Sequence, residues 1–323
     1  MTIGRSTALS DPGRKRRRNE DAWVCQPPIF AVADGMGGAR GGEIASRLAA
    51  AALREDEAGA SGEDRVIGLI QEANRRVYER SSEDSDASGM GTTVTLALVE
   101  DGGVTIGHVG DSRAYLIRGR KLEQLTDDHS LVAELVRSGR LSPEEAETHP
   151  QRSVITRVLG TDPEVDVDTL SVDARPGDLF LICSDGLTTM VGDDAILDIV
   201  ERNHSDLQAA AKELVSTANR SGGEDNITVV FFEIAEEGAQ VLEETRPMPA
   251  VDDASAGADE DTLTGLERVP AVDTMVVSKD EIEKAVEAAR PPKRRRWRWL
   301  LLVLLILLLL AAAGALYWLL YLS

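Results

Sequence analysis

Cysteine is scarce in this sequence, because Cys25 and Cys183 are the only two among 323 residues. Two cysteines cannot build a disulfide framework or a four-cysteine zinc site. Neither begins a Cys-x5-Arg run, since Ala31 and Thr189 stand where the arginine would be. The usual signature of a thiol phosphatase is therefore missing.

Few aromatic residues, few positive charges and two missing motifs exclude further classes of function. Aromatic residues make up only 4% of the chain, which is little for a surface that stacks on single-stranded RNA. There are 35 Lys and Arg against 56 Asp and Glu, and a net charge of −21 argues against a nucleic-acid binder. The four histidines form no His-x3-His pattern of a zinc hydrolase, and no Gly-Lys-Ser/Thr follows the glycines after Asp34 to make a nucleotide-binding loop.

The sequence predicts a folded domain over residues 1–236. Short apolar runs bounded by turn residues predict strands at 27–35, 92–101, 103–111, 114–118, 178–186 and 226–234. Helical periodicity or capping signals predict helices at 42–54, 63–81, 130–138, 207–220 and from Ser142 onward. Successive strands without an intervening helix favour antiparallel pairing. We therefore expect an α+β fold with an antiparallel core flanked by helices.

The C-terminal third has a different character. Residues 237–298 are rich in Asp, Glu, Ala, Pro and Gly, which predicts an acidic disordered linker. Leu300–Leu322 is an apolar run of 23 uncharged residues, enough to cross a bilayer as one helix, and we place this transmembrane helix at 299–323. The basic cluster Lys293–Arg298 precedes it and predicts a cytoplasmic N-terminal side. The sequence thus predicts a single-pass tail anchor in the cell membrane.

Aspartates stand at the ends of the predicted strands. Asp34, Asp111 and Asp185 each end an apolar run, and Asp225 precedes one. If these ends meet, two carboxylates 4 Å apart repel by about 4 kcal/mol at an effective dielectric constant near 20. Such a cluster needs protons or cations, and hard oxygen ligands select magnesium or manganese over zinc. The sequence therefore predicts a carboxylate metal site.

Seven stretches, in this order and spacing, resemble a known family. They are SDPGRKRRRNEDAW (Ser10–Trp23), FAVADGMGGARGGEIAS (Phe30–Ser46), GMGTTV (Gly89–Val94), GHVGDSRAYLIR (Gly107–Arg118), the run Leu125–Gly160, LFLICSDGL (Leu179–Leu187) and GGEDNITVV (Gly222–Val230). Together they resemble the metal-dependent protein phosphatases of the protein phosphatase 2C type, in the bacterial serine/threonine branch. The resemblance covers roughly residues 3–235.

The resemblance implies two stacked antiparallel sheets with helices outside, in α-β-β-α layers. It also implies two Mn²⁺ or Mg²⁺ ions in a cleft at one edge of the sandwich. Asp34 is expected to bridge both ions, and the carbonyl of Gly35 to bind one. Asp185 and Asp225 are expected to hold the other, and Asp111 to join Asp185 in a weaker third site.

The same resemblance assigns roles around the metals. Glu20 and Asp21 are expected to orient metal-bound waters, and Arg16 to clamp the phosphoryl oxygens. A water or hydroxide that bridges the metals would attack phosphoserine or phosphothreonine in line, without a phosphoenzyme. Arg17 and Arg18 read as surface charges that shape the local field. Expected partners are phosphorylated proteins, namely serine/threonine kinases and their substrates at the cytoplasmic membrane face, with a monomeric catalytic domain and no nucleic acid.

One departure and two alternatives remain at this point. Ala39 stands where many relatives have a histidine, so His129 and His149 are candidates for protonating the leaving group. The first alternative is a catalytically inactive, membrane-tethered scaffold that binds phosphoproteins. The second is a hydrolase of small phosphoesters. The stretch 137–160 corresponds to the mobile flap of the family.

Overall fold

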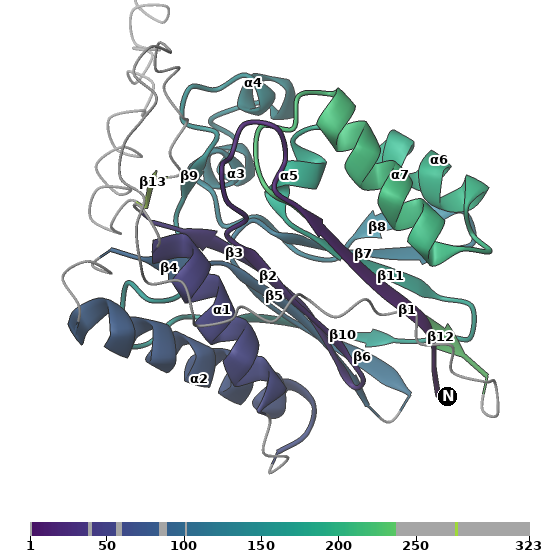
Figure 1. Ribbon diagram of the computed structural model, residues 1–323, viewed down its shortest axis with the longest axis horizontal. Coiled ribbons are helices and arrows are strands. Elements are labelled where there is room, and N and C mark those ends of the chain that lie inside the picture. Colours follow the sequence, from purple (N-terminus) through teal and green to yellow (C-terminus); the bar gives the residue numbers. More distant parts are fainter. Residues whose placement is uncertain are drawn as a thin grey trace, which may run out of the picture. The chain divides into compact units, whose positions relative to one another are not determined.

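The computed structural model describes residues 2–37, 41–55, 60–83, 89–100, 102–236 and 275–276, all in the first of the chain's two units, Met1–Ser278 and Lys279–Ser323. Two antiparallel sheets form its centre (Figure 1). The first has the order β1 (Thr2–Asp11), β12 (Ile227–Ala235), β11 (Leu179–Cys183), β7 (Arg113–Arg118) and β8 (Lys121–Gln124). The second has the order β10 (Asp168–Asp173), β6 (Gly103–Val109), β5 (Val94–Glu100), β3 (Ile29–Met36) and β2 (Asp21–Gln26), with β4 (Gly91–Thr92) paired to β3.

The two sheets pack through stacked aromatic rings. Phe232 of β12 lies with its ring centroid 4.3 Å from that of Phe30 on β3 and 4.8 Å from that of Phe180 on β11. All three are fully buried between the sheets. Because side chains alternate along a strand, the neighbours Val229 and Phe231 of β12 face the opposite way, into a second core beneath helices.

Helices cover both outer faces, which confirms the predicted antiparallel sandwich with flanking helices (Figure 1). On the second sheet lie α1 (Gly41–Arg54) and α2 (Gly62–Glu83), and small residues such as Ala45 and Ala49 let α1 approach closely. On the first sheet lie α5 (Asp185–Thr188), α6 (Asp193–Arg202) and α7 (Leu207–Arg220). The short α3 (Leu131–Arg137) and α4 (Pro143–Glu147) lie between β8 and β9 (Val154–Ile155).

Six strands and two helices among the described residues are additions to the sequence prediction. These are β1, β2, β8, β9, β10, β13 (Met275–Val276), α5 and α6. The predicted capping of α3 and α4 is confirmed, because Ser130 accepts from Ala133 N–H and Ser142 forms a capping box with Glu145. The stretch 137–160 thus contains the capped helix α4, and α3 ends at its first residue.

The predicted linker and anchor fall almost entirely outside the described residues. The exception is β13 (Met275–Val276), which pairs in parallel with β9, Met275 opposite Val154. None of the helices in the described part of the chain is long and apolar enough to cross a membrane. The predicted helix at 299–323 lies beyond that part.

Candidate metal centre

The predicted carboxylates come from the ends of both sheets and lie close together. Asp21 at the start of β2 is directly opposite Asp34 on β3. Asp111, Asp185 and Asp225 each lie two residues from the end of a strand, and Asp185 begins α5. Asp34 is repelled electrostatically by each of the other four carboxylates. The structure therefore brings together the acidic residues that the sequence singled out.

Hydroxyl groups of the first sheet hold Asp21. Its Oδ2 accepts hydrogen bonds from Ser184 Oγ at 2.9 Å and from Thr228 Oγ1 at 2.5 Å. Thr228 N–H in turn donates to Ser184 Oγ. Because Asp21 belongs to the second sheet and Thr228 to the first, these bonds tie the two sheets together beside the carboxylates.

The backbone of Asp34 is fixed by two threonines. Its N–H donates to Thr93 Oγ1 at 3.1 Å, and its carbonyl accepts from Thr93 N–H and from Thr92 Oγ1, each at 2.8 Å. The next residue, Gly35, admits no side chain, since a Cβ there would lie 2.1 Å from the carbonyl oxygen of Gly42. Only glycine allows this close backbone approach.

Burial and mutual repulsion raise the pKa values of the clustered carboxyls. Burial is the largest cause throughout, and it raises the pKa of Asp21 to about 6 and that of Asp111 to about 7. The pKa values of Asp34 and Asp185 are also raised, by burial first and then by repulsion from neighbouring aspartates. Like charges at such sites cannot all ionise without compensation.

The donor set suits divalent cations. Asp21, Asp111 and Asp185 each have an Oδ1 atom that is buried and without a hydrogen-bond partner among the described residues. Buried carboxylate oxygens are costly unless they bind protons, donors or metals. Within the described ranges, no group of three or more His, Cys, Asp or Glu side chains is arranged so that it could hold a metal ion as it stands. The cluster is thus a group of repelling oxygens that hard cations would neutralise.

Arg16 and Glu20 lie at the partly exposed side of this cluster. Arg16 Nη2 donates to Asp225 Oδ2 at 2.8 Å, and both side chains are 28% exposed. Burial opposes the charge of Arg16, but Asp225 raises its pKa overall. The pKa of Glu20 is raised by burial, against the attraction of Arg16. The positive charge of Arg16 therefore lies among the negative charges of Asp225, Asp34 and Glu20.

His129 and His149, the candidates for protonating the leaving group, lie in different surroundings. His129 is 2% exposed, its Nδ1 accepts from Gly110 N–H at 3.0 Å, and its Nε2 lies 3.1 Å from Asp168 Oδ2. Both ring nitrogens are thus engaged within the protein, so His129 is not available to a leaving group. His149 Nδ1 accepts from Gln151 N–H in the flap region. Ala39 lies outside the described residues.

Some important residues carried no sequence signal of their own. Ser184, Thr228 and Thr93 are single hydroxyl residues inside predicted strands or at their ends. The sequence predicted no role for Asn226, yet its side chain donates to the carbonyls of Pro12 and Arg18 and accepts from Glu20 N–H at 2.7 Å. The asparagine therefore joins the Asp225 turn to the loop that carries Arg16 and Glu20.

Comparison with known proteins agrees with this geometry. The model of the protein phosphatase 2C family matches residues 14–226. The chain is 42% identical over 236 residues to a serine/threonine phosphatase stp of Listeria welshimeri, covering 69% of this chain and 93% of that protein. It is 36% identical over 285 residues to the serine/threonine protein phosphatase PstP of Mycobacterium tuberculosis, covering 87% of this chain and 54% of that protein.

Solved structures give the same result. The crystal structure of the Mycobacterium tuberculosis serine/threonine phosphatase PstP/Ppp is 39% identical, with a TM-score of 0.69, and covers 72% of this chain and 100% of that one. The catalytic domain of PstP in complex with two manganese ions is 36% identical, with a TM-score of 0.67, and covers 72% and 99%. The chain therefore belongs to the protein phosphatase 2C family and is a metal-dependent serine/threonine protein phosphatase that uses Mn²⁺ or Mg²⁺.

Proposed function

We propose that the aspartate cluster binds two divalent ions and that the phosphatase hydrolyses phosphoserine and phosphothreonine directly with water. Asp34 would bridge the ions, the carbonyl of Gly35 would join one, and Asp185 and Asp225 would hold the other. Asp111 would join Asp185 at a weaker third position. The observation that carries this assignment is the set of buried, unpaired Oδ1 atoms on Asp21, Asp111 and Asp185.

The ions, when bound, lower the pKa of water and offset the charge of the phosphoryl group. Arg16 supplies the protein's own cation. Only its Nη2 is hydrogen-bonded to a described residue, so its other N–H groups are the donors that we assign to the phosphoryl oxygens. Arginine suits this task because its planar fork matches phosphate oxygens.

Asp21 and Glu20 act as positioning residues in this proposal. The hydrogen bonds from Ser184 and Thr228 fix Asp21 Oδ2 and leave Oδ1 to orient a water. Glu20 is fixed through its backbone, since its N–H donates to Asn226 and its carbonyl accepts from Gly35 N–H at 3.2 Å. Such outer contacts orient ligands and tune their basicity.

Phosphate release from a phosphothreonine peptide tests the assignment. The full chain is expected to release phosphate with Mn²⁺ and to stop with a chelator. Asp185→Asn is expected to lose more than 100-fold in kcat/KM, whereas Asp194→Asn, at an exposed position of α6, serves as the matched control. Unchanged turnover in Asp185→Asn would contradict the ligand assignment.

The same assay separates the alternatives. A catalytically inactive scaffold would bind the phosphopeptide without turnover. A hydrolase of small phosphoesters would turn over para-nitrophenyl phosphate far better than the peptide. We expect a higher kcat/KM for the peptide, because the family comparison favours phosphoprotein substrates.

We also propose that Leu300–Leu322 anchors the phosphatase in the cell membrane with the catalytic domain in the cytoplasm, where it would oppose serine/threonine kinases. The support is the uncharged run of 23 residues behind the basic cluster Lys293–Arg298. The full chain is expected to stay in membranes through alkaline extraction, and a chain that ends at Arg298 is expected to be released. Release of both would contradict the anchor.

A further inference from the structure

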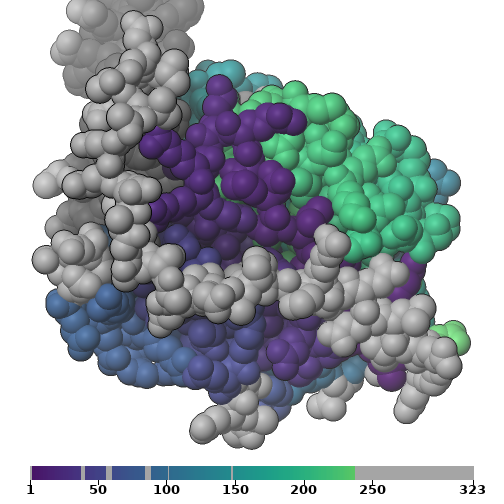
Figure 2. All heavy atoms as spheres, viewed as in Figure 1, coloured from purple at the N-terminus to yellow at the C-terminus, as the bar shows by residue number. Residues whose placement is uncertain are grey.

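The loop between β1 and β2 carries five consecutive cations in a chain of net charge −21. We call Arg14–Arg18, the sequence RKRRR, the cationic loop. Its place is next to the aspartate cluster, because Arg16 in its middle pairs with Asp225. In the space-filling view the N-terminal residues, in purple, lie on the surface beside the green residues of α7 (Figure 2).

The cationic loop is firmly fixed to the turn that carries Asp225. The N–H groups of Arg14 and Lys15 both donate to the carbonyl of Gly223, at 2.8 and 3.1 Å. The side chain of Asn226 donates to Pro12 O at 3.0 Å and to Arg18 O at 2.9 Å, and so holds both ends of the loop. The loop therefore presents its side chains from a defined position relative to the site.

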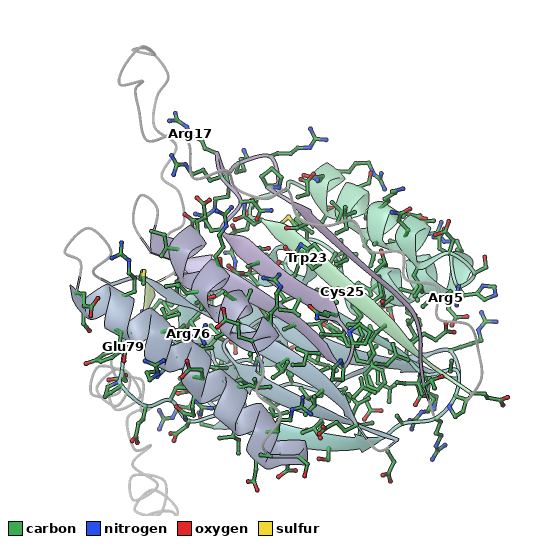
Figure 3. All side chains as sticks on the ribbon, turned by 60° about the horizontal axis from the view of Figure 1, so that its bottom comes forward. Arg5, Arg17, Trp23, Cys25, Arg76 and Glu79 are labelled. Atoms are coloured by element: carbon green, nitrogen blue, oxygen red, sulfur yellow. The ribbon has the colours of Figure 1, made fainter. Side chains whose placement is uncertain are left out.

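The side chains divide into one that points to the site and four that are exposed. Arg16 pairs with Asp225, whereas Arg14, Lys15, Arg17 and Arg18 are exposed. Figure 3 shows Arg17 extending away from the ribbon. The loop consists of a turn over residues 13–15 and a bend over residues 17–18, with the less exposed Arg16 between them.

The exposed cations have few carboxylate partners. Lys15 and Arg17 form no ion pair with a described residue, and Arg18 lies 3.9 Å from Glu43 Oε2. Arg14 Nε donates only to the carbonyl of Asn219, at 3.2 Å. On α2, by contrast, Arg75 lies 2.7 Å from both Glu72 and Glu79, and Arg76 lies 2.7 Å from Glu72 and Glu55. The cationic loop thus keeps its charges available in a protein rich in acids.

These charges are within reach of a bound substrate. Consecutive Cα atoms lie about 3.8 Å apart. In a substrate whose phosphorylated residue lies at Arg16, the residues two or three positions away therefore lie within about 7–10 Å of that residue. This is close to the screening length of about 8 Å at physiological salt. Acidic residues there would be attracted by Lys15 and Arg17, and also by Arg14 and Arg18.

We propose that the cationic loop, through Lys15 and Arg17, binds acidic residues beside the phosphorylated serine or threonine, so that the enzyme selects acidic phosphopeptides. This selection rests on the function proposed for the aspartate cluster. Arg16 is excluded from it, because it serves the phosphoryl group itself. Each exposed ion pair is expected to contribute about two- to five-fold to kcat/KM.

Two phosphothreonine peptides test the proposal, one with Asp and Glu beside the phosphothreonine and one with Asn and Gln there. The full chain, purified in mild detergent, is expected to prefer the acidic peptide, and the preference is expected to fall as salt rises. The variant Lys15→Gln/Arg17→Gln is expected to lose about five- to twenty-fold on the acidic peptide and little on the neutral one. Lys121→Gln/Lys212→Gln removes two exposed positive charges elsewhere and is the matched control.

The outcomes separate the two proposals. Equal losses in the two double variants, or no preference in the unmodified chain, would overturn the role of the cationic loop while leaving the phosphatase assignment intact. A loop that served an anionic lipid surface instead would give the same peptide preference in all three proteins, which also overturns it. Failure to hydrolyse either peptide or para-nitrophenyl phosphate with Mn²⁺ would instead contradict the proposed function.

Discussion

Asp21 and Asp34 lie directly opposite each other on the neighbouring antiparallel strands β2 and β3. Like charges at such a position normally destabilise a sheet. After burial, repulsion from Asp21 is the largest cause that raises the pKa of Asp34. The arrangement stores repulsion that a bound cation would relieve.

Neutralising Asp34 is expected to stabilise the metal-free domain and to inactivate the enzyme. Asp34→Asn would relieve about 1–2 kcal/mol of repulsion, which corresponds to a rise of roughly 2–8 °C in Tm for a domain of this size. Calorimetry in the presence of chelator measures this rise. Asp178→Asn is the control, because Asp178 is 2% exposed but paired with Arg118, and its loss is expected to lower Tm. A lower Tm in both variants would contradict stored repulsion at Asp34.

Manganese is expected to stabilise the protein more as pH rises. A carboxyl with a raised folded pKa favours folding at low pH, and this contribution is lost as pH rises through the folded pKa, here about 6 for Asp21 and about 7 for Asp111. Metal ions bind the deprotonated groups and reverse that loss. The Tm shift caused by Mn²⁺ is therefore expected to be small at pH 5 and large at pH 8. A shift that is independent of pH would argue against a carboxylate site.

His108 is expected to make the folded protein less stable as the pH falls below about 6.5, the opposite of the effect of the clustered carboxyls. Burial is the main cause that lowers the pKa of His108 to about 3, from an ordinary value of 6.5. In this pH range His108 therefore binds a proton in the unfolded chain but not in the folded chain, and stability falls as pH drops from about 6.5 towards 3. His108→Gln is expected to reduce this slope by up to about 1.4 kcal/mol per pH unit in urea unfolding. His204→Gln, at an exposed position, is expected to keep the original slope, and equal slopes in all three proteins would refute the role of His108.

His129 is expected to support metal binding as a positioning residue. The ring Nδ1 of His129 accepts the N–H of Gly110, which is next to Asp111. The backbone N–H of His129 donates to the carbonyl of Gly110 at 2.7 Å. His129→Ala is expected to raise the manganese concentration for half-maximal activity by about tenfold, with kcat largely kept at saturating metal. His129→Asn is expected to recover part of this loss, because its amide oxygen can accept from Gly110. A fall in kcat without a change in metal requirement would contradict this role.

The sequence predicted Asp34, Asp111 and Asp185 because each ends an apolar run, and Asp225 because it precedes one. Glu20 and Asp21 were expected only from the family resemblance. The sequence did not single out Ser184 or Thr228, since a lone hydroxyl residue in a strand has no periodic pattern, and their role depends on Asp21 from the other sheet. The strand β10 was missed for a related reason. Its residues are mostly exposed, and Leu170 is 41% exposed, so the expected alternation of burial is weak. In β1 a register irregularity between Ile3 and Ser6 interrupts the period of two.

The most direct test is the position of manganese itself. Crystals of the protein grown with Mn²⁺ and measured at the manganese absorption edge are expected to show two anomalous peaks at bonding distance from the carboxylates of Asp34, Asp185 and Asp225. Peaks elsewhere, or none at these side chains in a crystal of the active protein, would contradict the account.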